Sequence, residues 1–143
     1  MRFLRVSGKK AAVSAKVGDK GHATLTVTAD RTADAMGKRG VKVFATPFLV
    51  SLMENAASNV IEPHLPPAGS SVGTMVDIKH LAATPVGMTV RAEATLLETD
   101  GKRFLFSVEA WDEKDKIGEG RHERVALPDL EKFLGRVMKK AEQ

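Results

Sequence analysis

The chain has 143 residues, a formal net charge of +4 and no cysteine. This length suits one domain with a sizeable core. The lack of cysteine excludes disulfides, thiolate metal sites and cysteine nucleophiles. The basic residues are scattered and the sequence has few aromatic residues, so we expect no nucleic-acid partner. No run of residues suits a membrane span or a signal peptide, and we expect a cytoplasmic protein without a membrane partner.

The first half of the chain predicts one strand and one long helix. Residues 1–22 show no period, and we expect an edge segment or a partly ordered arm there. Residues 23–29 alternate apolar residues with threonines, which predicts a half-buried strand, and residues 30–42 predict a loop. The helix is expected to begin at Thr46, whose hydroxyl can cap it, and at the proline that follows; Pro63 ends the pattern.

This helix is predicted to be mostly enclosed by the rest of the protein. Glu54 is the only charged residue between Pro47 and Ile61, which is few for a solvated helix face, so we expect Glu54 to be buried. The apolar residues recur at helical spacing: Phe48, Leu49, Leu52, Met53, Ala56, Ala57 and Val60.

The second half of the chain predicts four strands and a final helix. The strands are expected at 71–82, 88–98, 103–113 and 116–127, with an Asp-Gly hairpin signal between the second and third. An amphipathic helix is predicted from Pro128 onward. This order predicts an α+β fold in which a curved antiparallel sheet of about five strands wraps one long helix. The uncovered side of that helix favours a partner subunit.

Single residues leave the chemistry open. The run Gly69 to Gly73 matches G-x-S-x-G, but a nucleophile elbow needs a strand before it and a helix after it, and here a proline-rich loop precedes a strand. Period two places His80 on one face with Val72, Val76 and Ile78, where an imidazole is either structural or functional. His122, Glu123 and Arg124 suggest cross-strand charge pairing. The four histidines show no metal-ligand spacing, and we expect no metal.

Three segments together carry more information. They read V-F-A-T-P-F-L-V-S-L-M-E from Val43, G-T-M-V-D-I-K-H-L-A-A-T-P-V-G from Gly73 and G-E-G-R-H-E-R-V from Gly118. This combination resembles the fluoroacetyl-CoA thioesterase branch of the hotdog-fold thioesterases, over about residues 43–134.

The resemblance implies a homodimer of hotdog protomers that hydrolyses a short acyl-CoA in a site at the subunit interface, with coenzyme A as part of the substrate and no other cofactor. It assigns the catalytic threonine, glutamate and histidine to Thr46, Glu54 and His80. It places Gly73 near the acyl group and makes Phe44 a substrate contact. Fluoroacetyl-specific members carry an aromatic lid residue where this chain has Gly40, and we therefore expect a broader short-chain acyl-CoA hydrolase.

Several roles stay open at this stage. Glu54 would either activate water or attack the thioester carbonyl itself. We expect a basic residue such as Arg121, Lys79, Lys102 or Arg103 to meet the CoA phosphates. Eight helical residues rise roughly 12 Å, so either the helix begins after Thr46 or the site combines two subunits. The alternatives to a hydrolase are an acyl-CoA binding or sensor protein and a hotdog hydratase or dehydratase.

Overall fold

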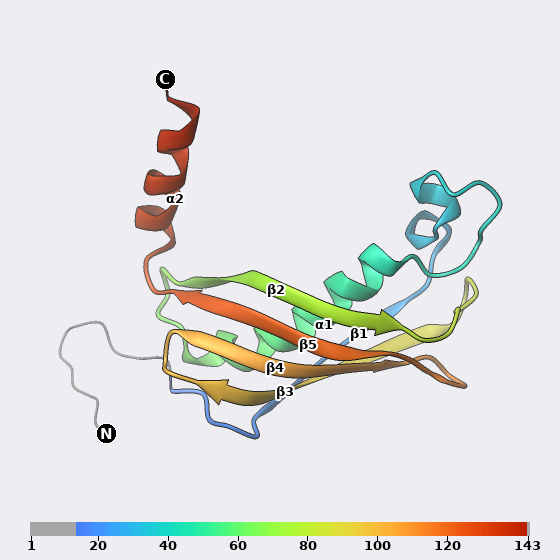
Figure 1. Cartoon of the computed structure of the whole chain (residues 1–143), viewed down its shortest axis with the longest axis horizontal. Coiled ribbons are helices and arrows are strands. Elements are labelled where there is room, and N and C mark those ends of the chain that lie inside the picture. Colours follow the sequence, from blue (N-terminus) through green and yellow to red (C-terminus); the bar gives the residue numbers. More distant parts are fainter. Residues whose placement is uncertain (1–13, 143) are drawn as a thin grey trace.

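The computed structural model describes residues 14–142, in which five antiparallel strands form one curved sheet beside a long helix (Figure 1). The strand order is β1-β3-β4-β5-β2, so β1 and β2 are the two edges. Residues 1–13 of the predicted N-terminal arm lie outside the described part. The strands are β1 (Lys20–Thr26), β2 (Ser70–His80), β3 (Thr89–Thr99), β4 (Arg103–Trp111) and β5 (Lys116–Leu127).

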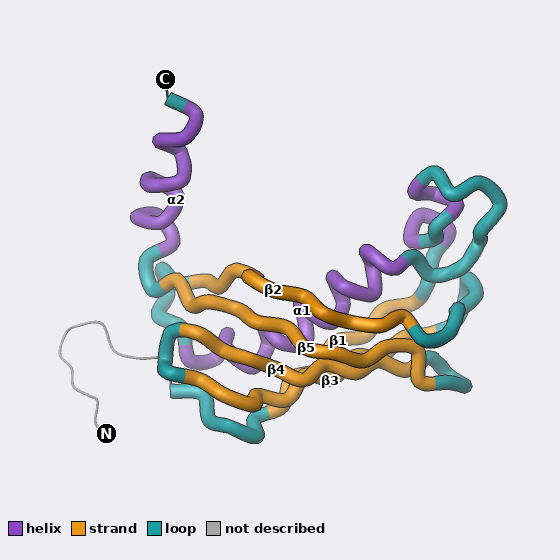
Figure 2. The backbone as a smooth tube through the Cα atoms, viewed as in Figure 1, coloured by secondary structure: helices purple, strands orange, loops and turns teal. Residues whose placement is uncertain are grey.

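The helices are α1 (Thr46–Ile61) and α2 (Leu130–Met138), with short 3-10 turns η1 (Ala29–Arg31), η2 (Asp34–Met36), η3 (Glu62–His64) and η4 (Lys139–Ala141). Figure 2 shows α1 lying along one face of the sheet. The predicted order of one strand, a long helix, four strands and a last helix is confirmed. The boundaries of the predicted helices and strands differ by up to three residues.

The core lies between α1 and the sheet. The apolar face of α1 is buried as its spacing predicts, and the alternating residues of β3 and β4 are buried opposite it: Val90, Ala92, Ala94, Leu96, Phe104, Phe106, Val108 and Ala110. Glycines bring the two layers close together. A Cβ on Gly118 would lie 2.8 Å from Met53 Cε, so a larger residue there would require the Met53 side chain to shift.

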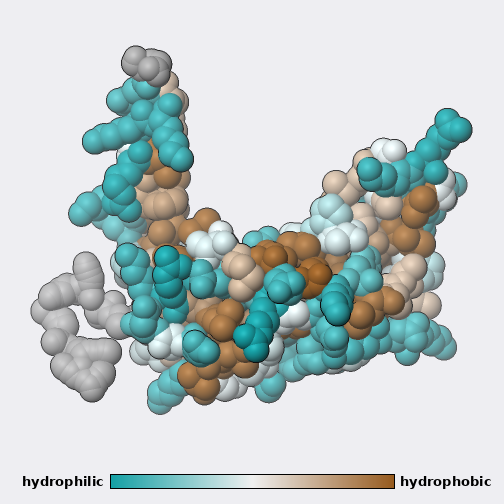
Figure 3. Space-filling view, in the orientation of Figure 1, coloured by the Kyte–Doolittle hydropathy of each residue, from teal (hydrophilic) through white to brown (hydrophobic). Residues whose placement is uncertain are grey.

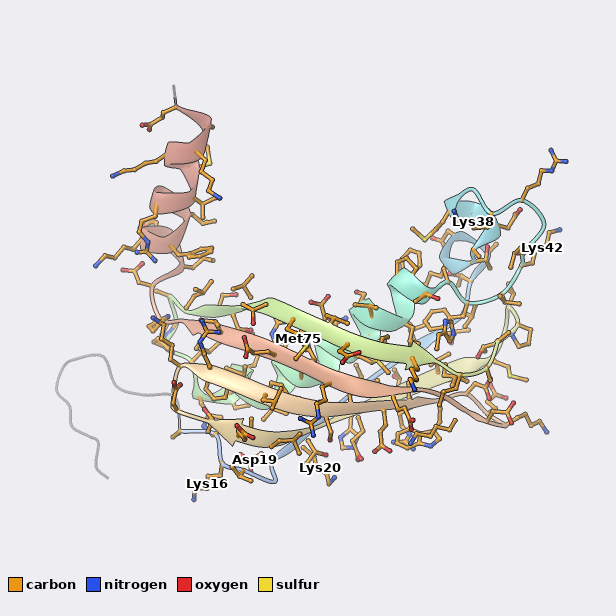
Figure 4. The ribbon with its side chains drawn as sticks, viewed as in Figure 1. Lys16, Asp19, Lys20, Lys38, Lys42 and Met75 are labelled. Carbon is orange, nitrogen blue, oxygen red and sulfur yellow. The ribbon has the colours of Figure 1, made fainter. Side chains whose placement is uncertain are left out.

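The first strand begins earlier than its pattern predicts. Lys20 already pairs with Thr95 of β3, and the turn before it is closed by Asp19, whose carboxylate accepts a hydrogen bond from Lys16 N at 2.8 Å (Figure 4). Gly21 has no side chain to show the alternation, and α1 packs directly against its backbone. Residues 20–22 therefore belong to β1 and not to an arm.

The β2 strand is the exposed edge of the sheet. Its residues Val72, Met75 and Val76 are exposed although they are apolar. Figure 4 shows Met75 near the middle of this strand. Beyond the edge, α2 projects from one end and residues 29–45 from the other (Figure 1). The space-filling view shows the hollow between them, floored by apolar atoms along β2 (Figure 3).

A bulge in β2 changes the predicted face of one residue. The register shifts between Gly73, which pairs with Arg124, and Met75, which pairs with Glu123. Since paired residues share a face, Gly73 lies on the α1 side together with Ile78 and His80. Val72 therefore points to the opposite face, and the simple period-two prediction was wrong for it.

Candidate active site

The first cluster joins the start of α1 to the end of β2. Thr46 is the first helical residue, and its Oγ1 lies 2.8 Å from Nδ1 of His80. Ala45, not Thr46, is the N-cap, and no side chain caps this helix. The prediction that the Thr46 hydroxyl caps the helix was therefore wrong, and the hydroxyl is paired with an imidazole.

His80 lies in surroundings that favour its neutral form. Burial lowers the pKa of the His80 imidazole below its ordinary value. Its Nε2 is buried and has no hydrogen-bond partner among residues 14–142. A buried ring nitrogen without a partner is costly, so a group from outside this chain would stabilise it.

A cavity of about 410 Å³ opens beside this pair. Its lining is mostly apolar, which suits a short acyl chain. The N–H of Thr46 has no acceptor in the described part of the chain and lies at the positive end of the helix macrodipole. The lining residues are Ala33, Val41, Val43, Phe44, Ala45, Thr46, His80, Leu81, Ala82 and Ala83.

The second cluster surrounds Glu54, two turns further along α1. Glu54 Oε2 lies 3.6 Å from Arg124 Nη1 and 4.0 Å from His122 Nε2. Its side chain is 37% exposed, whereas that of His122 is 1% exposed. Glu54 is therefore less buried than its sequence context predicts, because it lies beside the open β2 edge.

The hydrogen bonds of His122 define its tautomer. Nδ1 lies 2.8 Å from the carbonyl oxygen of Met75, which can only accept, so Nδ1 carries the hydrogen. Burial is the main cause that lowers the pKa of His122, and the ring is therefore neutral near pH 7. Nε2 then accepts a hydrogen bond from Arg124 Nη1 at 3.2 Å.

Arg124 is fixed by the serine of the G-x-S-x-G run. Its Nε donates to Ser71 Oγ at 2.9 Å, and its Nη2 donates to the Ser71 carbonyl at 3.1 Å. Residues 70–80 form strand β2, so no nucleophile elbow exists, as the sequence predicts. Ser71 instead aims the guanidinium at Glu54.

Gly73 leaves room for the Glu54 carboxylate. A Cβ at this position would lie 2.6 Å from Glu54 Oε2 and 3.1 Å from His122 Cε1. Any larger residue would force the carboxylate to move. Gly73 therefore belongs to the second cluster, beside the Glu54 carboxylate.

The structure thus brings the predicted residues together in two groups. Thr46 and His80 form one, with Phe44 in the cavity wall. Glu54 and Gly73 form the other, and a rise of roughly 12 Å along α1 separates Thr46 from Glu54. Arg121 is exposed on β5 next to buried His122, so it lies on the sheet face opposite α1 and joins neither group.

His122 and Arg124 are the site residues whose role the sequence analysis missed. Cross-strand pairing does occur nearby, because Arg103 Nη1 lies 2.8 Å from Glu123 Oε2. Strand alternation sends His122 and Arg124 to the other face, and that alternation was the available signal.

No cluster of three or more His, Cys, Asp or Glu side chains within residues 14–142 could hold a metal ion. No helix within the same range is long and apolar enough to cross a membrane.

The chain is similar to proteins of one known family. The family described as fluoroacetyl-CoA-specific thioesterase matches residues 27–129. A fluoroacetyl-CoA thioesterase from Streptantibioticus cattleyicolor is 44% identical over 99 residues, which cover 69% of this chain and 70% of that protein. A solved structure of a fluoroacetyl-CoA thioesterase superposes with a TM-score of 0.80 at 37% identity, over 87% of this chain and 96% of the other.

A second solved relative is a hypothetical protein of Thermus thermophilus from the thioesterase superfamily. It superposes with a TM-score of 0.79 at 33% identity and covers 90% of this chain and 96% of its own. These matches, with the five-stranded sheet around α1, confirm the predicted hotdog fold.

Proposed function

The chain belongs to the fluoroacetyl-CoA-specific thioesterase family, and from this premise we propose that it hydrolyses short acyl-CoA thioesters in a site shared by two subunits. The activity follows from the family. The residue roles and the dimer rest on the division of the site into two separated clusters, each with an unmet requirement. Thr46 and His80 lack a carboxylate, and the Glu54 carboxylate lacks a reacting partner.

Pairing of two β2 edges would join the clusters. Antiparallel pairing centred near Met75 sets His80 opposite the first residues of β2 in the other copy. Gly73 lies in that part of the strand, and Glu54 lies against Gly73. A symmetric dimer would therefore build two equal sites, each with Thr46 and His80 from one copy and Glu54 from the other.

The exposed apolar residues of β2 support this pairing. An unpaired edge strand with exposed valines and a methionine is a ready template for another strand. Burial of Val72, Met75 and Val76 would add hydrophobic stabilisation to the main-chain hydrogen bonds.

In the mechanism that this geometry favours, Thr46 is the nucleophile and His80 its base. Glu54 of the partner subunit accepts the Nε2–H of His80, which leaves Nδ1 free to take the Thr46 proton. The Thr46 oxygen bonds to the thioester carbon and the bond to sulfur breaks, releasing CoA thiolate. His80 then loses that proton to solvent and takes a proton from a water molecule whose oxygen bonds to the acyl carbon. The ester bond to Thr46 breaks, His80 returns this proton to the Thr46 oxygen, and the free acid leaves.

Arg124 and the helix start supply the electrostatics. Arg124 attracts the Glu54 carboxylate and would hold it at the subunit boundary. The N–H groups at the start of α1 face the region where negative charge develops on the carbonyl oxygen. No metal or cofactor is part of this proposal.

The acyl specificity is proposed to be broader than fluoroacetyl. Gly40 occupies the position of the aromatic lid, has a φ of +85° and donates its N–H to Asp34 Oδ1 at 2.7 Å. This left-handed turn favours glycine, so an aromatic side chain would be strained there. A cavity without that lid residue would admit short-chain acyl groups that are longer than fluoroacetyl.

Two expectations stay predictions. Arg121 is retained as a candidate contact for the CoA phosphates, although it lies on the opposite sheet face, and the cytoplasmic location is still inferred from the sequence.

The deciding experiment measures release of free CoA thiol from acetyl-, fluoroacetyl-, propionyl-, butyryl- and longer acyl-CoA. Glu54→Gln is expected to lose about 100-fold or more in turnover. Glu62→Gln is the matched control, because Glu62 is exposed just after α1. Acyl-CoA binding without thiol release would indicate a sensor, and water addition to an enoyl-CoA without thiol release would indicate a hydratase.

A further inference from the structure

The C-terminal helix α2 carries an apolar stripe, Leu134, Val137 and Met138, that stays exposed within residues 14–142. None of its residues is buried, and Leu134 and Val137 are 46% and 42% exposed. Figure 3 shows the apolar atoms along the side of α2 that faces the hollow above β2, with hydrophilic atoms on the other side. An uncovered stripe of this kind marks an interaction surface.

The base of α2 is fixed at the start of β2. Leu130 N donates a hydrogen bond to the Ala68 carbonyl at 3.0 Å, and Asp129 caps the helix through Lys132 N at 3.0 Å. Ala68 lies two residues before β2 begins. The position of α2 relative to the free edge is therefore defined.

Antiparallel pairing of β2 brings this end of the strand to the other copy's active-site pair. The partner's His80 would lie opposite Ser70, and the residue after it, Leu81, is 46% exposed and lines the cavity beside Thr46. We infer that the apolar stripe of α2 packs against the turn that begins at Leu81 in a second copy and adds a wall to the acyl cavity of that copy. This inference rests on the dimer of the proposed function.

A second copy suits the stripe better than a lipid surface. The polar face of α2 carries Lys132 and Arg136, and Lys139 and Lys140 follow in η4; these charges alone could suit an anionic membrane. The apolar side, however, faces inward across the hollow, between α2 and the projecting 29–45 segment (Figure 3). A flat bilayer cannot reach that side without contacting these projections first.

Disulfide trapping tests the contact, and the native chain contains no cysteine to interfere. Met75→Cys reports β2 pairing near the centre of the dimer. Leu81→Cys combined with Leu134→Cys reports the proposed contact. A disulfide between these positions must join two chains, because Leu81 follows the end of β2 whereas α2 is attached near its start. Leu81→Cys with Gly135→Cys is the matched control, since Gly135 faces open space one residue away.

We expect covalent dimers from Met75→Cys and from the 81/134 pair, with at least about tenfold less from the 81/135 pair. A dimer from Met75→Cys alone would overturn this inference and leave the proposed function standing. No dimer from either would overturn both the β2 pairing and this inference. Binding of the native chain to phosphatidylserine vesicles, lost in Leu134→Glu, together with no 81/134 dimer, would assign the stripe to lipid instead.

A kinetic measurement tests whether α2 lines the acyl cavity of the second copy or only contacts that copy. Leu134→Glu is expected to raise KM for butyryl-CoA about tenfold with little change in kcat at protein concentrations that keep the dimer intact. Gly135→Glu, which adds the same charge on the other side of α2, is expected to leave KM unchanged. An equal KM in all three proteins would show that α2 does not line the cavity.

Discussion

The hydroxyl of Thr46 lies 2.8 Å from Nδ1 of His80, which joins the first residue of α1 to the last residue of β2. The side chains meet because β2 runs beside α1 on the open edge of the sheet. In the proposed function, this contact is one half of the site, and Glu54 belongs to the other half.

Removal of the Thr46 hydroxyl tests whether it is the nucleophile. Thr46→Ala is expected to lower kcat about 100-fold or more, whereas Thr46→Ser, which keeps the oxygen, is expected to retain most activity. The free energy of unfolding should change by less than about 1 kcal/mol, because Thr46 caps nothing. Substantial thiol release by Thr46→Ala would instead favour Glu54 as the attacking group or as the base toward water.

Gly73→Ala tests the space reserved for the carboxylate. The added Cβ would lie 2.6 Å from Glu54 Oε2, so the carboxylate must move. We expect kcat/KM to fall about tenfold or more with the fold intact, as measured by thiol release and circular dichroism. Gly135→Ala, whose Cβ meets open space, is the control. Normal activity in Gly73→Ala would show that the Glu54 position is not critical.

The interaction of Arg124 with Glu54 can be measured by a double-mutant cycle. Arg124→Gln and Glu54→Gln, alone and combined, are compared by chemical unfolding. Because Glu54 is 37% exposed, we expect a coupling free energy of only about 1 kcal/mol. A coupling near zero would mean that Arg124 is held by Ser71 and His122 and does not position the carboxylate.

Stability is expected to depend on pH through His122. Burial lowers its pKa in the folded protein, so the unfolded chain binds the proton more readily. Stability from this group is therefore present above the ordinary pKa of 6.5 and is lost as the pH falls below it. His122→Gln, which keeps a donor and an acceptor, should flatten the dependence of the melting temperature between pH 7 and 5. An unchanged slope would assign the effect to other groups, such as His80.

The sequence was sufficient to predict the helices and strands and to select candidate site residues. Periodicity and prolines located α1, and alternation located the strands and the buried faces of β3 and β4. The motif resemblance assigned Thr46, Glu54 and His80 their roles, and the structure brings Thr46 and His80 together.

Other features needed three-dimensional structure. The bulge after Gly73 is invisible to a period-two pattern, because it depends on how β2 pairs with β5. The burial of Arg124 was hidden by its charge, since arginines are mostly exposed. Helix geometry predicts a separation of Thr46 from Glu54 only if both residues belong to one regular helix. The sequence left open whether the helix begins at Thr46 or after it, and in the structure α1 begins at Thr46.

Subunit complementation tests the shared site most directly. Thr46→Ala and Glu54→Gln proteins are each expected to be nearly inactive. When they are mixed and allowed to exchange subunits, each heterodimer carries one intact site, so activity should recover to about a quarter of the native value. No recovery, with subunit exchange verified by mass spectrometry, would contradict the account and place Thr46 and Glu54 of one chain in the same site.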